Sequence, residues 1–226
     1  MRRKIQFEQG KLYHLCNKSN DGNTIFFDKR DYTRMLFFML FYQFSTPFLN
    51  IGRSVSYFTK HSRFNIRSKR MEEIYPHRQV ELVAFAIMPN HFHILAQEKE
   101  EKGIAKYLMR LQGGYAKYIN TKRKQSGHVF QGNFRAVAVK TDPQLLYLSA
   151  YIHRNPRDLS EWKGKEIRYP WSSYQDFAQK NRWEQLLVPI VVLNQFSTPR
   201  SYKEFVETSS AKLKRKKIDI RDLILE

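Results

Sequence analysis

Cysteine is nearly absent from this chain: Cys16 is the only one among 226 residues. A single thiol excludes an intrachain disulfide and any zinc site that is built from several cysteines. Acidic residues are also scarce, because 21 Asp and Glu stand against 40 Lys and Arg, and the formal net charge is +19. Such an excess favours a polyanionic partner, and nucleic acid is the usual one.

Long hydrophobic runs are missing as well. The most apolar stretch, MLFFMLFYQF at 35–44, is too short to span a bilayer and predicts a core helix. The first ten residues, MRRKIQFEQG, are basic but lack the apolar region of a signal peptide. No long basic amphipathic helix indicates a membrane surface as partner. We therefore expect a cytoplasmic protein that is associated with the nucleoid and has no membrane partner.

The hydrophobic pattern alternates between the periods of strands and helices. Strands are expected at 11–17, 80–87, 91–97 and 128–140, and helices between Asp28 or Asp31 and residue 44, over 104–124, and from Asp142 onward. Strand, helix, two strands, helix, strand is the order of a ferredoxin-like unit. The sequence therefore predicts an α+β fold, with a ferredoxin-like antiparallel sheet and helices packed on one face.

Composition divides the chain into a main domain and an extension. Residues 1–178 are expected to form the main domain, and residues 179–226 a C-terminal extension with a basic tail. The polar segment 50–78, rich in Arg, Ser and Lys, is predicted to be a loop or an insertion. Both the insertion and the tail at 211–226 are candidates for extra contacts with a polyanion. A solvated C-terminus is an equally good explanation of the tail.

Two histidines stand two residues apart in the string MPNHFHIL, residues 88–95. On a strand, alternate side chains share a face, so His91 and His93 project together while Phe92 points the other way. Two adjacent imidazoles suit a metal ion. An isolated pair of this kind is more often structural, so the spacing alone leaves both interpretations open.

The helix expected at 104–124 contains Gly113 and Gly114 in its middle. Each costs roughly 1 kcal/mol relative to Ala, which is tolerated where a ligand or another backbone approaches closely or where helices pack. No Asp or Glu occurs from Lys102 to Lys140, and aromatic residues are interleaved with the cations. This pattern is typical of single-strand binding, although a solvated basic face would have the same composition. The expected DNA-contacting residues are Lys106, Arg110, Lys117, Lys122, Arg123, Lys124 and Arg135.

Five strings together resemble one family. They are YHLCNKSNDGNTIFFDKRDY (13–32), AFAIMPNHFHILAQ (84–97), LQGGYAKYINTKRKQSGHVFQGNFRAVAV (111–139), YIHRNPRDL (151–159) and YPWSSY (169–174). In this order they resemble the REP-associated tyrosine transposases, which are HUH-class transposases specific for single strands. The resemblance extends from about residue 11 to residue 174.

This resemblance implies a metal-dependent single-stranded DNA endonuclease and strand transferase, acting at DNA hairpins through a 5′-phosphotyrosine intermediate. His91 and His93 match the histidines that hold a divalent metal, expected to be Mg²⁺ or Mn²⁺. Tyr115 matches the nucleophile on a helix facing the histidine strand, and Tyr118 is the alternative. Asn120 is the candidate third ligand, although it lies about 140° round the helix from Tyr115.

The resemblance also suggests a monomer. In a homodimer, Tyr115 would be able to serve the histidines of the partner. Two other functions are compatible with the residues: a domesticated hairpin-DNA-binding protein without cleavage, and a histidine-based metallohydrolase of RNA or nucleotides. The domesticated binder would need neither metal nor tyrosine, and the hydrolase would remain active after Tyr115→Phe.

Overall fold

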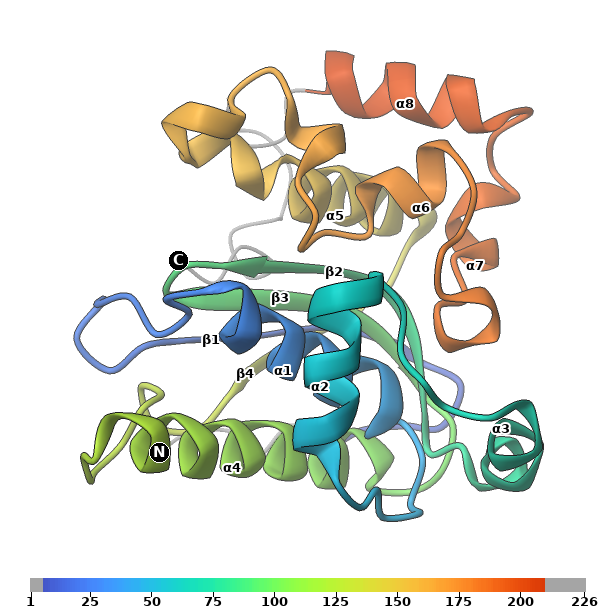
Figure 1. Ribbon diagram of the computed structural model, residues 1–226. Helices are drawn as coiled ribbons and strands as arrows, with labels where there is room; N and C mark the ends of the chain where they lie inside the picture. Colours follow the sequence, from blue (N-terminus) through green and yellow to red (C-terminus); the bar gives the residue numbers. More distant parts are fainter. Residues whose placement is uncertain (1–5, 210–226) are drawn as a thin grey trace.

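Figure 1 shows the computed structural model, which describes residues 6–209. The strands are β1 (Leu12–Lys18), β2 (Val80–Met88), β3 (His91–Glu98) and β4 (Arg135–Val139). The helices are α1 (Lys29–Phe41), α2 (Ile51–His61), α3 (Ser68–Ile74), α4 (Gly103–Arg123), α5 (Asp142–Arg154), α6 (Tyr174–Ala178), α7 (Ile190–Leu193) and α8 (Pro199–Thr208). Among the described residues, no helix is both long enough and apolar enough to cross a membrane.

The four strands form one antiparallel sheet in the order β2-β3-β1-β4. The unit β1-α1-β2-β3-α4-β4 has the ferredoxin-like order, so the predicted α+β fold is confirmed. The last strand is shorter than expected, because only residues 135–139 of the predicted 128–140 segment pair with β1. Residue 130 makes only an isolated bridge to Ser19.

Side chains near the helix ends explain where three helices begin. The carboxylate of Asp28 accepts a hydrogen bond from the backbone N–H of Asp31, which caps α1. Thr141 caps α5 one residue before the expected Asp142. The buried carboxylate of Glu98 accepts hydrogen bonds from the first backbone N–H groups of α4, which ties this helix directly to the end of β3.

Helices cover both faces of the sheet, which corrects the expectation of helices on one face only. In Figure 1, α1, α2 and α4 lie below the sheet, and α5, α6 and α8 lie above it. Each layer has its own apolar core: the first contains Phe92 and Ile94 of β3, and the second contains Leu95. The helices of the ferredoxin-like unit do share one face. The second layer is added by the chain after β4.

The structure describes two further segments that were singled out in the sequence. The segment 50–78 is not a loop, because it contains α2 and α3, and Val55 and Phe58 of α2 are buried in the first core. Within the segment 179–208, Val192, Tyr202 and Val206 pack into the second core against α5. The extension therefore completes a layer of the main domain as far as α8. The tail at 211–226 lies outside the described residues.

Candidate active site

The strand register gathers the chemically active side chains on the face that α5 covers. In the β1–β3 pairing, Cys16 lies opposite His93 and Lys18 lies opposite His91, while Arg135 of β4 lies opposite Cys16. Because alternate residues of a strand share a face, these five side chains project to the same side. The prediction that His91 and His93 project together is confirmed.

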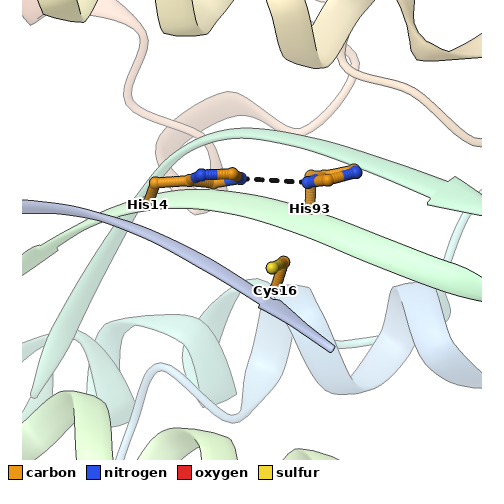
Figure 2. Close-up of side chains that lie close together, drawn as sticks. All are labelled: His14, Cys16 and His93. Carbon is orange, nitrogen blue, oxygen red and sulfur yellow. Dashed lines mark hydrogen bonds between the residues drawn. The ribbon is translucent and has the colours of Figure 1, made fainter. Parts of the chain in front are cut away.

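His93 is in direct contact with a histidine of the neighbouring strand. Its Nδ1 lies 3.0 Å from Nε2 of His14, and the two rings are nearly parallel. Figure 2 shows this bond and, beside the two imidazoles, the thiol of Cys16. His14, Cys16 and His93 are all buried, with at most 4% of each residue exposed. Burial raises the pKa of Cys16 to about 12, although Arg135 and Lys18 lower it, so the thiol is protonated at neutral pH.

His91 begins β3 and is half-buried beside a tightly held turn. Its Nδ1 lies 2.7 Å from the carboxamide oxygen of Asn90. The carbonyl of Pro89 accepts hydrogen bonds from the backbone N–H groups of Ile25 and Phe26, so the loop after β1 holds this turn. Beside the turn is a cavity of about 200 Å³, lined among others by the side chains of His91, His93, Cys16 and Arg135. The cavity gives small molecules access to the histidine face.

Tyr115 does not face the histidine strand, which corrects that expectation. It is fully buried in the first core, below the sheet, where its ring packs on Phe26 and Phe130. Its hydroxyl donates a hydrogen bond of 2.7 Å to the carbonyl oxygen of Ile25. Burial, and secondarily the charge of Asp31, raise the pKa of Tyr115 far above its usual value. A phenolate is therefore strongly disfavoured at this position.

The alternative, Tyr118, lies on the same helix and is also engaged. Its hydroxyl donates a hydrogen bond of 2.7 Å to the carboxylate of Asp31. Burial and this hydrogen bond raise the pKa of Tyr118 to about 12. Of the two glycines before these tyrosines, Gly114 serves helix packing, because the rings of Phe38 in α1 and of Tyr42 at its end lie against it. Gly113 has no such neighbour, since a methyl group there would meet no atom within 4 Å.

Asn120 is likewise separated from the histidines, because α4 packs below the sheet. Its carboxamide donates to the carbonyl oxygen of Gly127 and accepts from Gln125, which closes the C-terminal end of α4. The structure therefore does not bring Asn120 together with His91 and His93. Its role as third ligand has no geometric support.

Tyr151, which was not predicted as the nucleophile from the sequence, lies on the histidine face of the sheet. Tyr151 of α5 is buried, and its ring stands edge-on to His93 at 5.4 Å and to His14 at 6.2 Å between centroids. Asn155 follows four residues later, so both side chains leave the same side of the helix end. Its carboxamide nitrogen donates to the backbone carbonyl of Tyr151. Its oxygen is buried without a hydrogen-bond partner among the described residues.

A signal for these two residues was present in the sequence. The string YIHRNP carries Tyr151 and Asn155 at a spacing of four, which places both on one helical face. Tyr115 and Asn120 are five apart and do not share a face. The spacing therefore favoured the later pair, but only the layer arrangement shows which helix covers the histidines.

The predicted DNA-contacting residues are divided between the two sides of the sheet. Arg135 lines the cavity beside the histidines, whereas the other six cations lie on α4 or at its C-terminal end, in the layer below. Three of these six already have partners. Lys122 pairs with Asp28 and Asp31, Arg110 donates to backbone carbonyls at the end of α1, and the guanidinium of Arg123 lies over the ring of Phe27. Lys18, which was not selected from the sequence, also lines the cavity.

Comparison with known proteins finds one family to which part of the chain is similar. The family model described as "Transposase IS200 like" matches residues 53–155. Over this segment the chain is similar to the IS200-like transposases. The resemblance inferred from the sequence motifs is thereby confirmed.

The IS200-like segment contains β3 with His91 and His93, all of α4 and α5, and ends at Asn155. A solved structure of a REP-associated tyrosine transposase bound to a REP hairpin has the same fold, with a TM-score of 0.52 and 12% sequence identity. The alignment covers 80% of this chain and 86% of that chain. No curated protein matches the chain.

Proposed function

We propose that this IS200-like protein is a metal-dependent endonuclease and strand transferase that acts on single-stranded or hairpin DNA through a covalent tyrosine intermediate. The main support for the proposal is the contact of Tyr151 with His93, on the face of the sheet where the histidines line a cavity. The family supports transposase chemistry, and the hairpin bound to the fold relative supports a hairpin substrate. The net charge of +19 supports a DNA partner.

The side chains on this face fit a divalent cation. His91 and His93 offer two imidazole nitrogens, and the unpartnered carboxamide oxygen of Asn155 is the kind of atom that Mg²⁺ and Mn²⁺ prefer. We assign these three residues as the ligands, with Asn155 in place of Asn120. When bound, such an ion supplies Lewis-acid stabilisation of the phosphate charge.

Tyr151 is the proposed nucleophile. Its phenolic oxygen loses its proton and attacks the phosphorus of the scissile phosphodiester, a bond from tyrosine oxygen to the 5′-phosphate forms, and the bond to the 3′-oxygen breaks. The 3′-oxygen leaves and takes up one proton, which balances the proton lost by the phenol. The 3′-hydroxyl of a second strand reverses the reaction, because the phosphotyrosine bond conserves the energy of the broken bond. Lys18 and Arg135 lie beside the cavity, where their charges hold the DNA backbone. We further propose a monomer that is associated with the nucleoid.

The test is a cleavage assay on hairpin oligonucleotides labelled at the 5′ or the 3′ end, with Mn²⁺, Mg²⁺ or EDTA. Wild type is compared with Tyr151→Phe, Tyr115→Phe and Tyr118→Phe. Tyr147→Phe is the matched control, since Tyr147 lies one turn before Tyr151 on the same helix. A metal-dependent adduct on the 5′ end of the downstream fragment is expected in all proteins except Tyr151→Phe.

Other outcomes lead to different conclusions. An adduct that is lost only in Tyr115→Phe or Tyr118→Phe would preserve the chemistry and move the nucleophile to α4. Cleavage by every tyrosine variant, with no adduct, would favour a metallohydrolase. Hairpin binding by the wild type without cleavage, with hairpins from the host genome among the substrates, would favour a domesticated binding protein.

A further inference from the structure

Three potential metal ligands form a compact group on the histidine face. His14 and Cys16 lie two residues apart on β1 and therefore share a face, and Cys16 lies opposite His93 in the register. One ligand atom of each residue, an imidazole nitrogen or the sulfur, can be chosen so that all lie within 4.8 Å of one another. Figure 2 shows the three side chains gathered above the sheet.

The separations of these atoms lie on either side of those in a tetrahedral site. Zinc binds nitrogen at about 2.0–2.1 Å and sulfur at about 2.3 Å, so neighbouring ligand atoms are about 3.3–3.6 Å apart. Nε2 of His14 and Nδ1 of His93 lie 3.0 Å apart, slightly closer than this. The widest separation among the three ligand atoms is up to 4.8 Å, so an ion would replace the hydrogen bond after the side chains close by about 1 Å. The backbone, held by the β1–β3 pairing, would not have to move.

The donor set selects the class of ion. Two imidazoles and a thiolate are ligands of Zn²⁺ and of similar borderline or soft cations, and they are poor ligands for Mg²⁺. Cys16 and His93 also line the cavity of about 200 Å³, which offers a route for the ion and room for a water molecule as fourth ligand. Three protein ligands and one open position are usual for zinc at reactive sites.

We propose that His14, Cys16 and His93 form a binding site for a thiophilic divalent cation such as Zn²⁺. Neither His14 nor Cys16 lies in the segment 53–155 that matches the transposase family model. The proposal does not depend on the proposed function, because binding at this site needs neither DNA nor a tyrosine. It shares His93 with the proposed ligands of the hard cation, so only one of the two ions binds at a time.

The test uses Co²⁺ as a spectroscopic probe of the full-length reduced protein. Because Cys16 is the only cysteine, a sulfur-to-cobalt charge-transfer band in the near ultraviolet arises from this residue alone. We expect this band together with the intense visible bands of tetrahedral Co²⁺, and we expect stoichiometric Zn²⁺ to abolish both. Circular dichroism of each variant verifies that it is folded.

Three variants locate the ligands. Cys16→Ser, or Cys16→Ala if serine impairs folding, is expected to remove the charge-transfer band. His14→Gln is expected to weaken Co²⁺ binding at least about tenfold. His91→Gln, on the same face of β3, is the matched control and should retain the band. The proposal is overturned by weak octahedral spectra in the wild type, by wild-type binding in Cys16→Ser, or by unchanged affinity in His14→Gln. Hairpin cleavage with Mg²⁺, measured separately, does not bear on these outcomes.

Discussion

The ring of Tyr151 stands perpendicular to the ring of His93, with their centroids 5.4 Å apart. The contact joins α5 to β3 across the second core, while α4 packs on the opposite face of the same sheet. The sheet therefore separates the two helices that carry candidate nucleophiles. Tyr151 of α5 contacts His93 and His14, whereas Tyr115 and Tyr118 of α4 lie on the other side of the sheet.

Tyr115→Phe is expected to lower the free energy of unfolding by about 1 kcal/mol, because a buried hydrogen bond to the carbonyl of Ile25 is lost. The backbone N–H of Ile25 in turn donates a hydrogen bond to the carbonyl of Pro89, in the turn before His91. Tyr115 therefore stabilises the loop that holds this turn. Urea denaturation measures the loss. The variant should still form the DNA adduct. Normal stability with no adduct would instead restore Tyr115 as the nucleophile.

Substitutions of Asn155 and Asn120 distinguish the two candidate third ligands. Asn155→Ala is expected to raise the Mn²⁺ concentration for half-maximal cleavage about tenfold or more, and Asn120→Ala to leave it unchanged. Asn155 also donates to the carbonyl of Tyr151. Asn155→Asp distinguishes metal ligation from this hydrogen bond, because the aspartate retains an oxygen that can bind the metal but has no N–H group to donate to the carbonyl of Tyr151. A defect in Asn155→Asp equal to that of Asn155→Ala would argue against ligation.

DNA affinity is expected to depend on the cations beside the histidines. Arg135→Gln and Lys18→Gln should each weaken hairpin binding and reduce the slope of log affinity against log salt by about 1. Lys106→Gln, on the exposed side of α4, is the control and should have a smaller effect. Fluorescence anisotropy at several salt concentrations provides the measurement. The opposite ranking would place the DNA on the α4 side.

The two glycines of α4 should respond differently to alanine. A methyl group at Gly113 would meet no atom within 4 Å, whereas at Gly114 it would contact Phe38 and Tyr42 at 3.4 Å. Gly113→Ala is therefore expected to raise the free energy of unfolding by up to about 1 kcal/mol. Gly114→Ala should gain less, because the two rings must adjust. Thermal or urea unfolding tests both. A loss of stability in Gly113→Ala would show that the added methyl group meets a neighbour, although none of the described residues lies within 4 Å of it.

His153 is expected to make the fold sensitive to mild acid. Burial lowers the pKa of His153 from 6.5 to about 3, and its two nitrogens lie beside the hydroxyls of Tyr202 and Ser173. The unfolded chain therefore binds one proton more than the folded chain between these values. Stability is full above pH 6.5 and falls as the pH drops, by at most about 1.4 kcal/mol per pH unit from this residue.

The measurement compares urea unfolding of the wild type and of His153→Gln at several pH values between 7 and 4.5. The variant is expected to be less stable at neutral pH but to lose less stability on acidification. Equal slopes in the two proteins would show that His153 is not the group responsible.

Local patterns in the sequence were sufficient for the ferredoxin-like unit. Alternation predicted β1, β2 and β3 to within one or two residues, and the periodic apolar positions predicted α4. The helices in the segment 50–78 were not predicted, because the residues of this segment are mostly polar. The burial of Val55 and Phe58 in the first core stabilises α2, and composition alone does not indicate this burial. The predicted strand at 128–140 was too long, because a run of apolar residues does not show where strand pairing begins and ends.

The pairing of His91 with His93 on one face was determined by the sequence alone, because a strand has a period of two. The resemblance to the transposases, too, rests on short strings that need no coordinates. Which tyrosine accompanies the histidines was decided only by tertiary structure. A helix that follows β4 can pack on either face of the sheet, and the burial of the second apolar core places α5, with Tyr151, against the histidines. Asn155 follows at the C-terminal end of this helix. The same pairing of distant strands brings His14 and Cys16 to His93, a cluster that no local spacing predicts.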